Sequence, residues 1–146
     1  MHLQGPWSAE EIGAFLQASV IPLRLGVVRP EGTPLVLSLW FVPQDGALCC
    51  ATSRDAYVAK LLRREPRCAF EVASDKPPYK GVRGQGRASL HDEQGAEILE
   101  RLLDRYAIAP TSKLGRMLLT RAENETAIQI VPHRMTSWDF AARMSA

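Results

Sequence analysis

The sequence predicts an α+β fold in which helices pack on the outside of a mostly antiparallel sheet or barrel. The hydrophobic pattern switches several times between the helical period and the strand period, and the predicted order of elements is α-β-β-β-α-β-β-α-α-β. Because helices do not alternate regularly with strands, a doubly wound parallel sheet is not expected. The chain has 146 residues, 46% of them hydrophobic and 23% charged, so we expect one compact domain over residues 1–146.

The first predicted element is a helix that begins after Ser8. The sequence from Ser8 to Glu11, SAEE, is a capping box, in which the Ser8 hydroxyl accepts from the Glu11 amide while the Glu11 side chain reaches back. Trp7 and Ile12 have the spacing of a hydrophobic staple across this cap. Pro22 ends the helical segment.

A strand pattern follows the helix. Alternating apolar residues over Leu23–Val27 lead into turn residues at Arg29–Gly32. The apolar run Pro34–Val42 predicts the next strand, and Gln44–Gly46 is a hairpin turn signal. Ala47–Thr52 then returns as the second arm, so the sequence predicts two strands joined by a tight turn.

The rest of the chain is predicted to alternate between short helices and short strands. In order they are a helix over Ser53–Arg64, strands over Cys68–Ala73 and Gly81–Leu90, a helix capped by Asp92 with its apolar stripe at Ile98–Tyr106, a helix over Ser112–Thr120 and a strand over Thr126–Val131. Pro132 lies directly after that last strand, and the tail Arg134–Phe140 follows.

Composition argues against several classes of protein. The formal charge of +2 is too small to indicate a nucleic-acid-binding protein. No apolar run approaches the roughly 20 residues that span a bilayer, and the first residues lack the pattern of a secretory signal. We therefore expect a soluble, cytoplasmic protein without a membrane or nucleic-acid partner.

The three cysteines are expected to be buried free thiols. Cys49, Cys50 and Cys68 lie in apolar runs, where a free cysteine behaves as a small hydrophobic residue. There is no CxxC pair, and the three histidines form no HxH or HxxxH pair. The sequence thus predicts no metal site.

A basic region in the middle of the chain is the first candidate for a binding site. Between Arg54 and Arg87 there are nine Lys and Arg against four Asp and Glu. Thr52 and Ser53 lie between a predicted strand and a predicted helix, whose free N-terminal amides favour an anion. Their hydroxyls and Lys60, two turns later, could hold a phosphate. The alternative is that Ser53 caps the helix and Lys60 points into water.

Familiar catalytic motifs are absent. The sequence has no GxSxG elbow, no P-loop and no HExxH, and a lone GxG at Gly84–Gly86 is not a dinucleotide-binding fingerprint. We therefore name no catalytic residue. Trp40 and Phe41 are expected in the core, whereas Trp138 lies either in the core or over a pocket or interface.

The sequence resembles the pyridoxamine 5'-phosphate oxidase-like, FMN-binding split β-barrel superfamily. The resemblance extends from about Ala9 to Phe140 and rests on four stretches that occur in order along the chain. The stretches are PLVLSLWFVPQDGALCCATS (34–53), DAYVAKLLRREPRCAFEV (55–72), PPYKGVRGQGRASL (77–90) and IQIVPHRMTSWDF (128–140).

This resemblance implies a split barrel that works as a homodimer with two flavin sites at the subunit interface. It also implies roles for individual residues in three groups. Those that would line the isoalloxazine ring are Leu37, Ser38, Leu39 and Trp40. Those that would hold the FMN phosphate are Thr52, Ser53 and Lys60. Further cofactor contacts would come from Lys80, Gly81 and Val82, with Trp138 of the partner subunit closing the pocket.

The function that the resemblance implies is an FMN-dependent oxidoreductase of a small substrate. The flavin would carry the chemistry, so no catalytic triad is needed. Pyridoxamine phosphate itself is not the expected substrate, because the tail lacks the RLxxR-type segment. One alternative is an F420-dependent reductase whose anionic tail runs along Arg54, Arg83 or Arg87. Another is a non-catalytic flavin- or haem-binding protein, with His133 as the candidate axial ligand.

Overall fold

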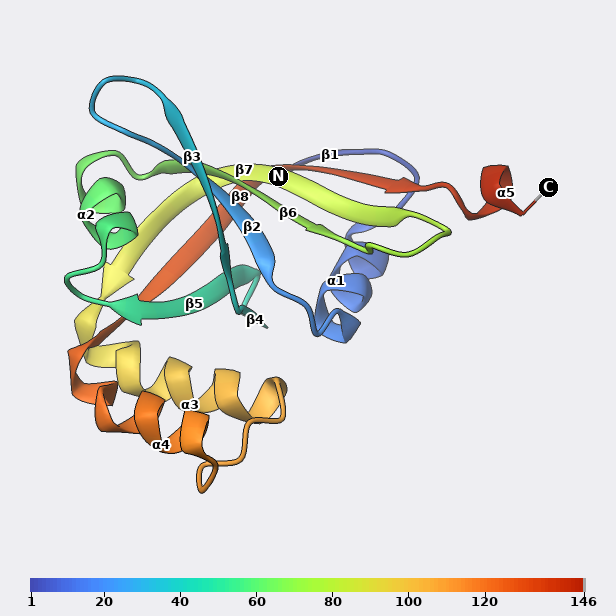
Figure 1. The fold of residues 1–146 in the computed structure, drawn as a ribbon. Coiled ribbons are helices and arrows are strands. Elements are labelled where there is room, and N and C mark those ends of the chain that lie inside the picture. The colour runs from blue at the N-terminus through green and yellow to red at the C-terminus, as the bar shows by residue number, and fades with distance from the viewer. Residues whose placement is uncertain (146) are drawn as a thin grey trace.

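A computed structural model describes residues 1–145, in which one curved sheet carries helices on its outside (Figure 1). The strands are β1 (His2–Gln4), β2 (Leu23–Val28), β3 (Pro34–Leu39), β4 (Val42–Gln44), β5 (Ala47–Ser53), β6 (Arg67–Ala73), β7 (Lys80–His91) and β8 (Glu125–Asp139). The α-helices are α1 (Ala9–Ala18), α2 (Tyr57–Arg64), α3 (Gly95–Arg105), α4 (Lys113–Thr120) and α5 (Ala141–Met144), with 3-10 turns at Asp92–Gln94 and Ala122–Asn124.

The sheet is an incompletely closed antiparallel barrel. Its strand order is β3-β2-β6-β7-β8-β5-β4, every pair along this path is antiparallel, and β1 adds to β8 in parallel. The two ends of the path, β3 and β4, are not hydrogen-bonded to each other. Helices α3 and α4 lie side by side below the sheet in Figure 1. This architecture confirms the predicted α+β split barrel with peripheral helices.

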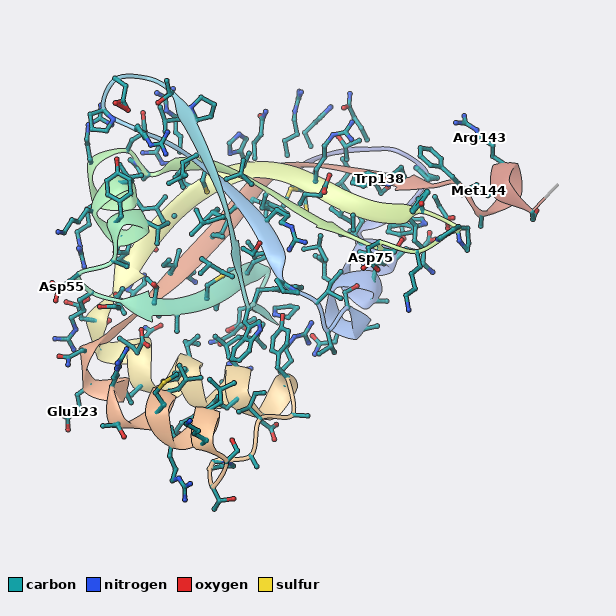
Figure 2. All side chains as sticks on the ribbon, in the orientation of Figure 1. Asp55, Asp75, Glu123, Trp138, Arg143 and Met144 are labelled. Atoms are coloured by element: carbon teal, nitrogen blue, oxygen red, sulfur yellow. The ribbon has the colours of Figure 1, made fainter. Side chains whose placement is uncertain are left out.

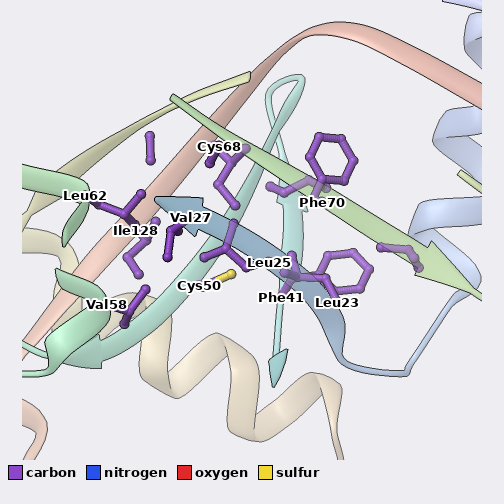
Figure 3. Packing of buried hydrophobic residues seen from close by; sticks show 14 of the residues in the cluster. Leu23, Leu25, Val27, Phe41, Cys50, Val58, Leu62, Cys68, Phe70 and Ile128 are labelled. Carbon is purple, nitrogen blue, oxygen red and sulfur yellow. The ribbon is translucent and has the colours of Figure 1, made fainter. Parts of the chain in front are cut away.

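The interior of the barrel is filled by the alternating apolar residues of its strands (Figure 3). Leu23, Leu25 and Val27 of β2 point inward, as the period-2 pattern predicts. The three cysteines are free and buried, as expected. Burial raises the pKa of the Cys68 thiol to about 11, so this thiol stays neutral at physiological pH.

Helix α1 begins with the predicted capping box. The Glu11 amide donates to the Ser8 hydroxyl at 3.2 Å, and the Ser8 amide donates to the Glu11 carboxylate at 3.3 Å. Trp7 packs its ring against Phe15, with centroids 4.9 Å apart. The chain therefore enters the helix in a fixed direction.

Replacing Ser8 with alanine is expected to lower the free energy of unfolding by about 1 kcal/mol, because the Glu11 amide loses its acceptor. Urea unfolding followed by circular dichroism measures this change. Gln17→Ala, an exposed substitution in the same helix, serves as the control and is expected to stay within about 0.5 kcal/mol of the wild type. Equal midpoints for Ser8→Ala and wild type would contradict the role of the cap.

The strand predicted over Pro34–Val42 is interrupted at Trp40 and Phe41. Its first part, β3, pairs with β2, and only β4 pairs with β5. The predicted hairpin turn is confirmed, since Asp45 and Gly46 have φ angles of 53° and 79°, as a two-residue turn with positive φ requires. The prediction that the whole run pairs with Ala47–Thr52 is wrong.

Tyr106, at the end of α3, explains the interruption. Its hydroxyl accepts from the Phe41 amide at 3.2 Å and donates to the Ile21 carbonyl at 2.7 Å. The Phe41 amide thus has a partner without a neighbouring strand. The side chain of Phe41 is fully buried, and the Trp40 ring stacks on that of Tyr106.

Two predicted helix starts are wrong. The helix predicted from Ser53 begins only at Tyr57, after a turn in which the Ser53 hydroxyl accepts from the Asp55 amide at 3.3 Å. Asp92 opens a 3-10 turn and does not cap the following helix, whose N-cap, Gln94, makes no side-chain bond. In both places turn residues precede the helix, and local patterns do not reveal how many.

The last strand is much longer than predicted, because β8 continues through Pro132. The register with β7 shifts there: Gln85 pairs with Arg134, whereas Gly86 pairs with Pro132. His133 is therefore an extra residue in a β-bulge, where a proline without an amide hydrogen is tolerated.

Candidate cofactor site

The open seam of the barrel, defined here as the gap between β3 and the end of β5, is the candidate site. β3 pairs with β2 on one edge, and its other edge has no strand partner among residues 1–145. β5 pairs with β8 over Leu48–Ser53, but with β4 only over Ala47–Cys49. Unpaired backbone donors and acceptors therefore face the seam from both sides, ready to bind another molecule.

A cavity of about 390 Å³ lies at the lower end of the seam, where β3, β5, α3 and α4 meet. Three of the predicted ring-lining residues, Ser38, Leu39 and Trp40, form one wall, and Ala51 of β5 lies in another. Leucines of α3 and α4 complete a mostly apolar lining. Stacking on Tyr106, with ring centroids 5.0 Å apart, holds the Trp40 ring in place.

The side chains of the predicted ring-lining group do not all face the seam. Leu37 and Leu39 pack against the barrel core, whereas Ser38 between them is exposed. This alternation follows from the strand period. A ligand in the seam would thus contact this strand through its backbone and Ser38.

Glu125, at the start of β8, also lines the cavity, and the sequence analysis did not identify it. Its Oε2 atom is buried and has no hydrogen-bond partner within the described chain. Burial raises the pKa of this carboxyl, and the nearby Arg121 guanidinium partly opposes the shift. No local signal marks this residue, because its burial depends on α3 and α4.

The residues predicted to hold the FMN phosphate begin beside this cavity, because Thr52 and Ser53 directly follow Ala51 and Ser53 pairs with Glu125. Thr52 and Ser53 end β5, and their side chains point to opposite faces because they are adjacent in a strand. Lys60 lies on the exposed face of α2 and has no hydrogen bond or ion pair within residues 1–145. Arg63, by contrast, donates to the Arg54 carbonyl at 2.9 Å.

Lys80, Gly81 and Val82 lie far from this group. They begin β7 and pair with the end of β8, where Gly81 is opposite Trp138. Ser53 is at the other end of β8, opposite Glu125, so roughly 40 Å of strand separates the two groups. Figure 2 shows the same separation, with Asp55 and Trp138 at opposite ends of the molecule.

Packing within the chain explains why several residues at the start of β7 and the end of β8 have the side chains they do. A Cβ at Gly81 would lie 2.7 Å from the Trp138 ring, so glycine is needed for the ring to lie over the strand. The Arg83 guanidinium lies 5.2 Å from the centroid of the same ring. Val82 is fully buried in the core, which leaves only its backbone for a ligand.

The arginines predicted to bind an F420 tail and the histidine predicted to bind haem lie in different parts of the structure. Arg54 is directed to the start of β8, where its Nε lies 3.5 Å from the Glu125 carbonyl oxygen. Arg83 lines a second hollow of about 710 Å³ on the outer face of the sheet, together with Arg24 and Arg134. Arg87 is exposed on β7, and His133 is exposed in the bulge of β8.

Comparison with solved structures decides the fold. A conserved hypothetical protein from Mycobacterium tuberculosis is 25% identical over 92% of this chain and 86% of its own, with a TM-score of 0.78. A protein from Listeria innocua, named as a pyridoxamine 5'-phosphate oxidase, is 19% identical over 88% and 95%, with a TM-score of 0.67. This chain has the pyridoxamine 5'-phosphate oxidase-like split-barrel fold. An F420 reductase shares it, at 22% identity over 82% of this chain and 92% of its own and a TM-score of 0.67.

In comparisons of sequence alone, no family model and no curated protein matches this chain. Within residues 1–145, no three His, Cys, Asp or Glu side chains are grouped so as to hold a metal ion. In the same part of the chain no helix is both long enough and apolar enough to cross a membrane. The seam is the place where unpaired strand edges and an apolar cavity lie together.

Proposed function

We propose that this split barrel is an FMN-binding oxidoreductase of the pyridoxamine 5'-phosphate oxidase-like family, acting on a small substrate as a homodimer. The observation that carries the proposal is the seam. It offers unpaired strand backbone beside an apolar cavity, with the hydroxyl residues Thr52 and Ser53 directly after Ala51 of the cavity wall, and the exposed Lys60 lies on α2, the helix that follows β5. A ligand with a planar ring and an anionic tail could place its ring against the cavity and the strand edge, and its tail near Lys60.

The ring end of the seam suits a flavin. The isoalloxazine pyrimidine edge presents alternating donors and acceptors, which an unpaired strand edge such as that of β3 can satisfy. When bound, FMN would supply hydride or electron transfer. The chain would bind and orient the ring through the backbone of Leu37–Trp40 and exclude water with the leucines of α3 and α4.

The phosphate end depends on Lys60 and the two hydroxyl residues at the end of β5. Lys60 is two residues from Val58 and Leu62, whose burial in the core fixes the orientation of α2. Its ammonium group could therefore pair with a phosphate without first breaking another contact. Thr52 and Ser53 would add one hydroxyl from each face of the strand.

A second copy of the chain would complete the site. Lys80–Val82 and Trp138 lie far from the seam of their own chain, because the length of β8 separates them from the end of β5 and strands β6 and β2 lie between β7 and β3. In a two-fold symmetric dimer, the far end of one copy can lie beside the seam of the other, and the same contact then forms twice. Light scattering coupled to gel filtration tests this, with twice the monomer mass as the expected result.

The names of structural neighbours support a cofactor of this kind. They include FAD-binding proteins from Mesorhizobium loti and Mycobacterium smegmatis, the F420 reductase and a haem storage protein from Vibrio cholerae. F420 is the second candidate, since the hollow lined by Arg24, Arg83 and Arg134 could hold a longer anionic tail. Haem is less well supported, because His133 is an exposed residue in a bulge.

The visible absorption spectrum of the purified protein tests the cofactor class directly. Flavin bands and an FMN mass released on denaturation are the expected result. A deazaflavin mass would favour the F420 alternative, and a Soret band would favour haem. A colourless protein that takes up none of the three would refute the proposed function.

The substitution Lys60→Ala is expected to weaken FMN binding about tenfold, because a charge-assisted bond to the phosphate is lost at a solvent-exposed site. Fluorescence titration of FMN into apoprotein measures the dissociation constant. Lys113→Ala, an equally exposed change at the start of α4, is the matched control and should leave it unchanged. If riboflavin, which has no phosphate, shows the same loss as FMN, the phosphate assignment is wrong.

A further inference from the structure

The side chains on the outer face of β2, β6 and β7 are exposed, and they line the hollow of about 710 Å³ described above. We propose that two copies of the chain associate through this face, with Arg24 of each copy paired with the partner's Glu71. In this arrangement β8 of each copy lies beside the open edge of the partner's β3. The association does not depend on a cofactor, whereas the idea that it completes a flavin site rests on the proposed function.

Strand register places the charged residues of this face in one row across the sheet. Arg24 of β2 is opposite Glu71 of β6, which in turn is opposite Arg83 of β7. Side chains directly opposite each other on one face of a sheet are close enough to interact. Within residues 1–145, however, no ion pair joins Glu71 to either arginine. The row thus presents alternating charges that remain available to another molecule.

The neighbouring row leaves room for that molecule to approach. Gly26 is opposite Ala69, two residues along the strands from Arg24 and Glu71. Neither has a side chain longer than a methyl group, so a facing sheet can pack at the usual distance of about 10 Å, which Arg and Glu side chains can bridge. Val36, opposite Gly26 on β3, is 67% exposed, and a facing sheet would bury it.

Charge complementarity selects a second copy of this chain as the partner. A two-fold axis that runs along the strands between β2 and β6 puts β2 of each copy opposite β6 of the other, and β3 opposite β7. Arg24 then faces the partner's Glu71, and the symmetry forms this pair twice. Gly26 meets the partner's Ala69 at the closest approach. An axis through β6 would instead place Glu71 against the partner's Glu71, which like-charge repulsion disfavours.

The other arginines of the face meet no like charge in this arrangement. Arg83 lies opposite the partner's Ser38, and Arg134 lies on β8, beyond the partner's β3. An axis between β6 and β7 would need Arg83 for the ion pairs, although its guanidinium already lies over the Trp138 ring. The axis between β2 and β6 is therefore favoured.

The same axis carries Trp138 to the partner's seam. β8 is the third strand from the axis on its side and β3 is the second on the other, so β8 lies just past the free edge of the partner's β3. Trp138 is on the outer face, because its ring covers Gly81. It is two residues beyond Thr136, in the direction in which β3 runs from Ser38 to Trp40. Trp138 therefore reaches the level of the partner's Trp40, in the wall of the cavity.

Reversing each charge of the proposed ion pair tests the interface without any cofactor. In Glu71→Arg and in Arg24→Glu, a homodimer would bring like charges together, so the dimer dissociation constant is expected to rise about a hundredfold. A mixture of the two variants restores opposite charges at both contacts, and a 1:1 heterodimer with nearly wild-type affinity is expected. Analytical ultracentrifugation measures the association, and circular dichroism shows that each variant is folded. Glu100→Arg, an exposed reversal on α3, is the control and should leave the dimer unchanged.

Reversal variants that stay dimeric would overturn the inference, and so would monomeric variants that do not associate on mixing. Weaker F420 binding by Arg24→Glu with an unchanged dimer mass would assign the hollow to an anionic tail instead, and would also overturn it. A monomeric wild type would overturn it together with the homodimer of the proposed function. FMN titration of that protein would still decide the cofactor independently.

FMN titration of mixed dimers tests the second step, which rests on the proposed function. Lys60→Ala is added to the Glu71→Arg copy, and Trp138→Ala to the Arg24→Glu copy. If Trp138 serves the partner's seam, one seam carries both defects and the other carries none, so half of the sites are expected to keep the wild-type affinity. Weakened binding at every site would show that each tryptophan serves its own chain and would overturn this step. A wild-type dimer that binds no FMN would refute the proposed function, while the association result stands.

Discussion

Phe41→Ala is expected to lower the free energy of unfolding by about 3–5 kcal/mol, the cost of deleting a fully buried aromatic ring. The Phe41 ring lies where α1, α3 and the junction of β3 and β4 meet. The Arg105 guanidinium lies 5.0 Å from its centroid and donates to the Leu16 and Ser19 carbonyls at the end of α1. Removing the ring leaves a cavity and also removes the surface on which Arg105 rests.

Chemical denaturation followed by tryptophan fluorescence measures this loss, since Trp40 is adjacent to the site. Val36→Ala on β3 is the matched control: Val36 is 67% exposed, so its truncation is expected to cost no more than about 0.5 kcal/mol. A destabilisation below about 1 kcal/mol for Phe41→Ala would mean that the surrounding helices close the space, and would contradict the packing described here.

Gly95→Ala is expected to destabilise the protein by about 3 kcal/mol, although alanine is the better helix former. A Cβ at Gly95 would collide with the carbonyl oxygen of Glu125, which is a backbone atom and cannot swing aside as the end of a flexible side chain can. Either α3 or the start of β8 must move. The same movement would displace the Glu125 carboxyl from the cavity.

Gly13→Ala is the matched control, because Gly13 also lies in a helix but has nothing within 4 Å of an added Cβ. It is expected to stabilise the protein by about 0.5–1 kcal/mol. Thermal unfolding of the two variants therefore gives shifts of opposite sign. Shifts of the same sign would show that α3 and β8 are less tightly packed than this structure indicates.

Sequence patterns predicted correctly those elements that are determined by residues close together in the chain. The capping box at Ser8 and Glu11 involves two residues three apart, and β2 is amphipathic because one of its faces fills the barrel. The hairpin turn at Asp45 and Gly46 needs only its own φ angles. Each of these predictions is confirmed.

The errors arise where a distant partner changes the outcome. The interruption at Phe41 depends on Tyr106, which is 65 residues away, and the continuation of β8 through Pro132 depends on a bulge opposite Gly86. Glu125 was missed for the same reason, since its burial comes from packing against other elements. For the site, the resemblance named residues on β3 and β5, which flank the seam, and assigned Trp138 to the partner subunit. That assignment stays a prediction, and in this chain Trp138 lies at the other end of β8 from Glu125.

The connectivity of β8 has a consequence for how the chain folds. This strand pairs with β1, β5 and β7, so it joins residues near 2, 50 and 85 in one ladder. All three partners are synthesised before it, and their edges toward β8 stay unpaired until residues 125–139 have emerged from the ribosome. Contacts over such sequence separations slow folding, on the order of milliseconds to seconds for sheets of this kind. During that delay the exposed edges can pair with other chains, so a holdase chaperone present during synthesis should raise the yield of folded protein.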